Sequence, residues 1–125
     1  MKEGGSYQAD AADYESAHHI KISDAATYAG ASTQGDTKII LSTASGNQAG
    51  EEIHGRVSVY GPALTTNHHA MWEIALFDDT ATPLLRMITG VGAYNANTNA
   101  ITGVRFMGST GNITSGTINL YGLRK

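Results

Sequence analysis

Short runs of alternating apolar and polar residues recur along this chain of 125 residues, and turn-forming residues separate them. Because successive side chains of a strand point to opposite faces, such alternation is typical of β-strands with one buried face. The most regular run is residues 52–60. Further strands are predicted at residues 19–22, 38–42, 71–77 and 84–91, and twice within residues 100–123. This number of short strands, separated by frequent turns, predicts an all-β antiparallel sandwich.

The last part of the chain predicts a closing hairpin. In residues 100–108 the side chains of Val104 and Phe106 share one face, and Ile118 and Leu120 share a face of the following run. Between the two runs lies Ser-Thr-Gly-Asn, whose residues accept left-handed φ angles or bond their own backbone. We therefore expect residues 100–123 to form a hairpin that reverses near Gly111.

The predicted core follows from the faces of these strands. In residues 71–77 the apolar face holds Trp72, Ile74 and Leu76, while Glu73 lies on the opposite, solvent-facing side. Trp72 could alternatively stack on a sugar, but its phase with Ile74 and Leu76 favours the core. The complete predicted core consists of Val57, Val59, Trp72, Ile74, Leu76, Ile88, Val104, Phe106, Ile118 and Leu120.

Two segments lack a strand pattern. Residues 24–36 are rich in Gly, Ala, Ser and Thr around Tyr28, which predicts a loop. Residues 1–17 are small, polar and aperiodic, so they have too little apolar area to order alone. We predict an extended N-terminal arm (residues 1–17), either a loose terminus or a segment that orders on a neighbouring subunit, followed by one β-sandwich domain (residues 18–125).

The charge and composition exclude several classes of protein. The net charge is −3 and only 8 residues are Lys or Arg, which argues against a nucleic-acid partner. No run reaches the ~20 apolar residues of a membrane span, and the N-terminus lacks a signal peptide, so we expect synthesis in the cytoplasm and no membrane contact. Cysteine is absent, which excludes disulfides and cysteine ligands for metals.

The polar residues predict no catalytic, metal or cofactor site. Adjacent histidines, His18–His19 and His68–His69, would point to opposite faces of a strand and could not share an ion. We expect the second pair in an exposed loop and His54 facing solvent. The acidic pairs at residues 51–52 and 78–79 fall at strand ends, where solvated charge is the ordinary role, and no nucleophile motif is present. The chain is therefore not expected to be an enzyme.

A resemblance becomes visible in the C-terminal residues AITGVRF and GNITSGTINLYGL. They resemble the closing hairpin of a β-sandwich module that recurs in tailed-bacteriophage virion proteins. Residues 53–62 are similar to a "G-x-apolar-x-apolar-x-x-P" strand of that module, and residues 90–94 to its Gly-rich strand end. The resemblance covers residues 53–123 and implies a jelly-roll-like sandwich.

The resemblance also implies a function. It predicts a non-enzymatic virion protein made in the host cytoplasm, most simply a capsid decoration, cement or head-fibre protein that forms a homo-oligomer, a trimer, on other capsid proteins. The alternative is a receptor- or carbohydrate-binding module of a tail fibre, with a host surface glycan as ligand. The initial methionine and the absence of a coiled-coil or fibrous repeat favour the free-standing decoration protein. An unrelated bacterial sandwich adaptor also remains open.

Tyrosines outside the predicted core are the candidate residues of an assembly interface. Tyr7 and Tyr14 are the large side chains of the predicted arm, Tyr28 lies in the predicted loop, and Tyr121 is the tyrosine that the resemblance singles out. An aromatic ring with a polar hydroxyl suits an interface because one end tolerates burial and the other can remain wet.

Overall fold

The computed structural model describes residues 1–3, 5–10, 12–24, 28–43, 45–78, 81–109 and 113–122. Its strands are β1 (Lys2–Glu3), β2 (Ser6–Tyr7), β3 (Tyr14–Ile22), β4 (Tyr28–Asp36), β5 (Ile53–Tyr60), β6 (His68–Phe77) and β7 (Leu85–Tyr94). The described residues contain no helix, and so no helix that could cross a membrane. The all-β class that the sequence predicts is confirmed.

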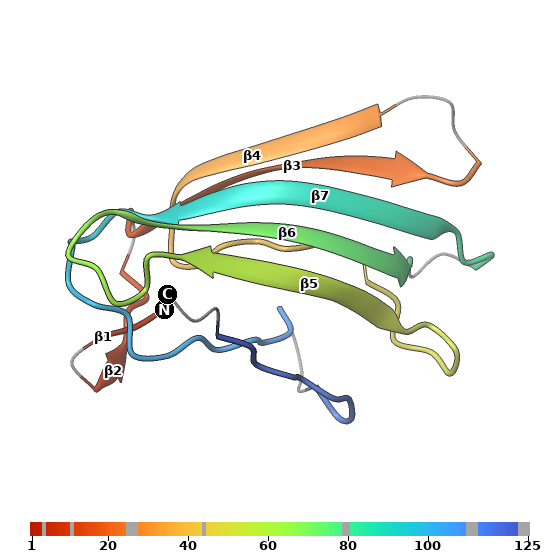
Figure 1. Ribbon diagram of the computed structural model, residues 1–125. Helices are drawn as coiled ribbons and strands as arrows, with labels where there is room; N and C mark the ends of the chain where they lie inside the picture. The colour runs from red at the N-terminus through yellow and green to blue at the C-terminus, as the bar shows by residue number, and fades with distance from the viewer. Residues whose placement is uncertain are drawn as a thin grey trace.

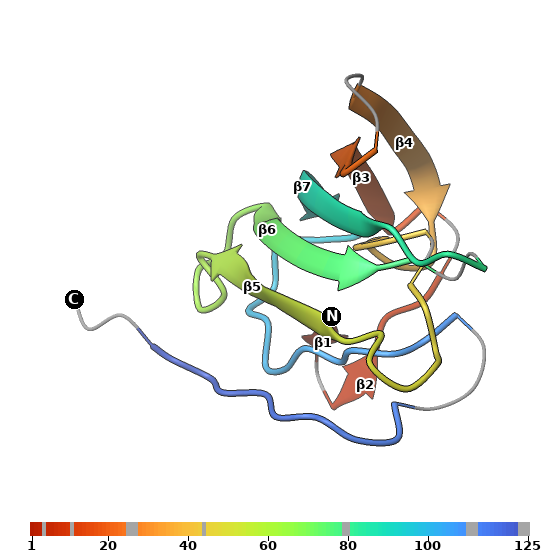
Figure 2. The same cartoon turned by 90° about the vertical axis from the view of Figure 1, so that its right-hand side faces the viewer.

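The main layer is a five-stranded sheet in the order β4-β3-β7-β6-β5, and every pairing in it is antiparallel (Figure 1). The two-stranded sheet of β1 and β2 and the irregular segment after β7 lie on one side of it, as the view turned by 90° also shows (Figure 2). This arrangement is compatible with the predicted antiparallel sandwich. The second layer is built largely from irregular chain, and it leaves the opposite face of the main sheet open.

The hydrophobic core lies on the covered face of the main sheet. Trp72, Ile74 and Leu76 of β6 are buried there, as their alternation predicts. The core cluster consists of Ile20, Trp72, Ile74, Leu76 and Ile88, with Ile22, Ile39, Leu41 and Val57 packed against it. Burial of these apolar side chains supplies most of the driving force for folding.

Gly90 of β7 makes room for the largest core side chain. It is paired with Trp72 on one side and with His18 on the other. A β-carbon on Gly90 would lie 2.3 Å from the Trp72 ring and 2.8 Å from the β-carbon of His18. The absence of a side chain at Gly90 therefore lets the indole lie flat under the sheet.

The N-terminal half contains three departures from the sequence predictions. The predicted loop at residues 24–36 contains β4, whose small residues pair along the length of β3. β3 begins at Tyr14, so the boundary predicted at residue 17 is wrong: residues 14–17 are paired with both β4 and β7. Residues 38–42 form no strand, although Ile39 and Leu41 pack against the core.

The first residues of the chain are bound to the body of the protein. The backbone N–H of Lys2 donates to the Gly103 carbonyl at 2.7 Å, and that of Thr102 donates to the Lys2 carbonyl at 2.8 Å. The Glu3 carboxylate accepts hydrogen bonds from Tyr94 at 2.9 Å, from Asn97 at 2.7 Å and from Asn99. These bonds fasten β1 to the end of β7 and to the chain that follows it.

The predicted closing hairpin does not form in the described residues. Gly103 forms an isolated bridge with Lys2 of β1, the other residues of 101–109 belong to no strand, and neither do residues 113–122. The predicted reversal near Gly111 lies outside the described residues. Val104, Phe106, Ile118 and Leu120 are consequently exposed, and their predicted place in the core is wrong. Alternation shows that a segment can pair as a strand, but not that a partner strand lies within the same chain.

Candidate functional site

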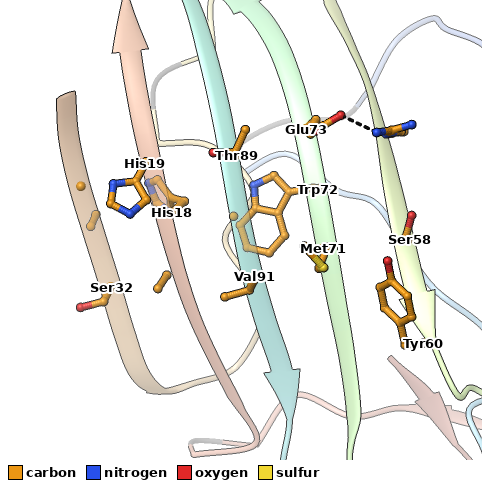
Figure 3. Close-up of a pocket in the computed structure, with 15 residues that line it drawn as sticks. His18, His19, Ser32, Ser58, Tyr60, Met71, Trp72, Glu73, Thr89 and Val91 are labelled. Atoms are coloured by element: carbon orange, nitrogen blue, oxygen red, sulfur yellow. Dashed lines mark ion pairs between the residues drawn. The ribbon is translucent and has the colours of Figure 1, made fainter. Parts of the chain in front are cut away.

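The open face of the main sheet forms the first candidate surface. A shallow groove of about 840 Å³ crosses all five strands on this face (Figure 3). The pairing register places His19, Thr89, Glu73 and Arg56 in one row across β3, β7, β6 and β5. The next row consists of Ala17, Val91, Met71 and Ser58. The first row is polar and the second is largely apolar.

The polar row contains an ion pair. The Arg56 Nη2 atom lies 2.8 Å from Glu73 Oε2, and both side chains are well exposed (Figure 3). Exposed ion pairs contribute little to stability, typically about 0–1 kcal/mol. The solvent-facing position predicted for Glu73 is confirmed. Its partner Arg56 was missed, because the cross-strand register cannot be read from either strand alone.

Aromatic and apolar groups lie along the same face. Tyr60 and His69, which are paired between β5 and β6, stack with ring centroids 4.9 Å apart and planes at 10°. Met71, Met87 and Val91 are about half exposed. Trp72, in contrast, is buried on the other side of the sheet, which confirms its core position. The exposed tyrosine that lines the groove is Tyr60, while Phe77 and Tyr28 are exposed on the same face outside the groove.

Each histidine pair is split between the two faces of the sheet, because adjacent residues of a strand point to opposite sides. His18 points into the core, where burial and then the charge of His19 lower its pKa. The loop predicted for His68 and His69 is wrong, because both residues belong to β6, and of the two His69 is exposed. His68 is fully buried: its Nδ1 lies 3.1 Å from the Gly61 carbonyl oxygen and its Nε2 2.7 Å from that of Asn99. His54 faces solvent, 3.0 Å from Glu52.

Among the described residues no three His, Asp or Glu side chains gather as metal ligands would. Asp78 was expected to be a solvated charge, but it is completely buried. It accepts hydrogen bonds from the Leu84 N–H at 3.0 Å and from Arg86 Nε at 2.9 Å. Asp78 therefore holds the connection between β6 and β7, and its neighbour Asp79 lies outside the described residues.

The second candidate surface is the extended C-terminal segment, residues 113–122. All ten residues are exposed, and no hydrogen bond connects them to the rest of the described chain. Ile118, Leu120 and Tyr121 are 69%, 97% and 83% exposed. In Figure 2 the segment runs as a dark blue trace away from the body of the protein. It presents both apolar side chains and unpaired backbone to solvent.

The structure does not bring the four candidate interface tyrosines together. Tyr14 is buried within the single chain, where its hydroxyl donates to the Gln8 carbonyl at 2.8 Å and burial raises its pKa to about 12. Tyr7 is partly exposed, with the Arg105 guanidinium 4.8 Å from its ring centroid. Tyr28 and Tyr121 are exposed, the first in β4 and the second in the C-terminal segment.

The comparisons with known proteins add no relative. No protein-family model matches the chain, no curated protein is similar to it, and no solved structure matches its fold.

Proposed function

We propose that this chain is a non-enzymatic structural protein of a tailed-phage virion, a capsid decoration or head-fibre protein that acts as a homo-oligomer, a trimer. The observation that supports this proposal is the exposed C-terminal segment. Residues 113–122 contain the sequence that resembles the ending of phage virion modules, and they extend into solvent with Leu120 97% exposed. A segment of this kind suits a protein whose purpose is to bind other proteins.

The physical argument is the cost of leaving such a segment uncovered. Burial of apolar surface is favourable by roughly 25 cal/mol for each Å². Unpaired N–H and C=O groups of an extended segment are, in addition, a template for pairing with another chain. The isolated chain leaves the side chains and the backbone of this segment in water. The free energy of apolar burial and of backbone pairing is therefore gained only when the segment binds another chain.

The rest of the fold is suited to a decorating role. The main sheet consists of five hydrogen-bonded antiparallel strands, and the Glu3 hydrogen bonds fasten β1 to Tyr94 at the end of β7 and to Asn97 after it. In a symmetric assembly each copy repeats the same modest contact, and linked contacts strengthen one another without any new interaction. Binding of many copies through such repeated contacts is sufficient for a decorating role, which needs no catalytic group.

The test is to look for the protein on purified particles of the phage that encodes it. Mass spectrometry should detect the chain in stoichiometric amounts, and a cryo-EM map should show repeated copies of the sheet on the head. A density confined to the tail fibres would select the alternative described next. Complete absence from the particles would contradict both.

The alternative is a carbohydrate-binding module of a tail fibre, and the open groove favours it. The Tyr60–His69 stack offers an aromatic surface, and Ser32, Ser58 and Thr89 lie in the same groove (Figure 3). Sugar rings present an apolar face to aromatic groups and hydroxyls to polar ones. A glycan array should then give signals that are lost in Tyr60→Ala and kept in Tyr28→Ala, an exposed tyrosine of β4, with no release of reducing sugar.

A further inference from the structure

We propose that the C-terminal segment of one copy, residues 113–122, pairs as an added strand with the free edge of β5 in a second copy. This inference builds on the proposed function, since it names the partner of the same exposed segment. The donor strand would be residues 113–122, and the acceptor would be the outer edge of β5. In the described part of the single chain, neither of them has a partner strand at these positions.

The donor has the pattern of a strand without a partner. Ile118 and Leu120 share one face, while Thr117, Asn119 and Tyr121 share the other. The segment contains no charged residue, so no desolvation of charge opposes its burial. It lies extended, with all of its residues exposed and no hydrogen bond to the rest of the described chain.

The acceptor is the outer edge of β5. This strand pairs with β6 on one side, and its other side faces solvent as the end of the sheet. Natural edge strands are commonly protected by proline, by bulges, by short length or by several charged side chains. β5 has eight residues, no proline and no register shift against β6, and its charged residue Arg56 is already paired with Glu73. It is therefore an edge with little protection against pairing.

The apolar side of β5 matches the apolar side of the donor. Ile53 is 55% exposed, and Val57 and Val59 are only half-buried, although all three face the core side of the sheet. A strand added to this edge with Ile118 and Leu120 on the core side would continue the hydrophobic layer beyond β5. Thr117 and Asn119 would then lie on the open face, beside Ser58.

The other edge of the sheet is a poorer acceptor. β4 places Ala29, Ala31 and Thr33 on the core side, paired with Ile20, His18 and Ser16 of β3. These small side chains offer little apolar area to an added strand. The pairing of β3 with β4 also contains a register shift between Tyr14 and Glu15, and β4 ends at Asp36. Bulges and terminal charges of this kind discourage edge pairing.

A second copy is the occupant that satisfies both surfaces. Thr102 and Gly103 are held at Lys2 of β1, and within one chain the segment of residues 113–122 leaves the β5 edge uncovered. If each copy donates its segment to the next, every donor and every acceptor is filled in a closed ring. Head-to-tail exchange of this kind is consistent with a cyclic trimer.

The experiment uses introduced thiols, because the natural chain contains no cysteine. Chains with Asn119→Cys are mixed in equal amounts with chains with Ser58→Cys and oxidised mildly. Thr117→Cys is tested in parallel to allow for a shift of register. The control acceptor is Ser32→Cys, which lies on the open face of β4, the other edge strand. We expect the mixed disulfide with Ser58→Cys to form at least several times more than that with Ser32→Cys.

A second measurement separates this inference from the proposed function. Leu120→Asp should convert the oligomer to a monomer in light scattering, whereas Ser32→Asp, on the other edge strand β4, should not. Equal cross-linking of Asn119→Cys to Ser58→Cys and to Ser32→Cys would overturn the inference. A chain that carries both Asn119→Cys and Ser58→Cys gives a second check. If its disulfide forms only within the same chain, the inference is also wrong. If Leu120→Asp detaches a protein that is already monomeric from the virion, the segment binds the capsid directly. The strand exchange and the trimer are then wrong, and only the virion role of the proposed function remains. If the mixed disulfides form but the protein is absent from virions, the strand exchange is supported and the proposed function is wrong.

Discussion

At the scale of single residues, the packing of Gly90 against Trp72 is the most sensitive point of the interior. A β-carbon at residue 90 would meet the indole at 2.3 Å, so Gly90→Ala must displace the ring or the backbone. Overpacking of this kind costs typically about 1–3 kcal/mol. Gly30→Ala in β4 is the matched control, because its nearest contact would be 3.6 Å. Urea denaturation should show a loss for the first variant and little change for the second.

Trp72 itself should make a large contribution to stability. It is buried among Ile20, Ile74 and Ile88, and large-to-small changes of this type cost roughly 3–5 kcal/mol. Met71→Ala, one position away on the open face, should change the free energy of unfolding by less than about 1 kcal/mol. Equal losses in the two variants would contradict the assignment of the two faces of β6.

His18 should make stability depend on pH. Burial lowers its pKa below 6.5, so in the window below pH 6.5 the unfolded chain binds a proton that the folded chain does not. Stability should therefore fall as the pH decreases from 6.5 towards the folded pKa, and His18→Leu should flatten this slope. The contrast is Glu3, whose pKa is held below 4.5 by hydrogen bonds from Asn99, Asn97 and Tyr94. Glu3→Gln should alter the slope only below about pH 4.5, in denaturation curves recorded at each pH.

At the scale of elements, two Arg–carboxylate pairs among the described residues lie in opposite environments. Arg86 Nη2 lies 2.7 Å from the fully buried Asp78, whereas Arg56 and Glu73 are both exposed. Removal of one partner from a buried pair leaves an uncompensated charge and costs about 3–5 kcal/mol. Arg86→Leu should lower the thermal midpoint strongly, and Arg56→Leu should leave it nearly unchanged. A similar effect of both would contradict the assignment of Asp78 as the clamp between β6 and β7.

The sequence predicted some elements well and others not at all, for physical reasons. β5, β6 and β7 were predicted because their β-branched and aromatic residues alternate, which local reasoning detects. β4 was missed because its Gly, Ala and Ser residues resemble a loop, and only pairing with β3 makes it a strand. The alternation of each strand predicts which of its residues face the open groove. It does not predict which residues of neighbouring strands lie side by side there. The rows of the groove depend on the pairing of β3 with β7, which lie far apart in the chain.

At the scale of the whole molecule, the two ends of the chain should respond differently to deletion. Removing residues 1–17 eliminates the first part of β3 together with the buried Tyr14, so the shortened chain should fail to fold. Removing residues 113–125 takes away a segment whose described part makes no hydrogen bond to the body of the protein, and the thermal midpoint of a monomer should stay the same. Circular dichroism during heating measures both. A folded product of the first deletion would restore the interpretation of residues 1–17 as a dispensable arm.

The order of strands in the main sheet also has a consequence for how fast the protein can fold. β5, β6 and β7 follow one another in sequence and in space, but β3 becomes an interior strand only when β7 pairs with it across more than sixty intervening residues. Closing such a long loop is slow, and β proteins with many distant contacts fold in milliseconds to seconds. During synthesis the hairpin of β3 and β4 leaves the ribosome well before its partner. The hairpin must therefore remain free of aggregation until β7 is synthesised and pairs with β3. The small, polar side chains of β4 lower its tendency to pair with other chains in this interval.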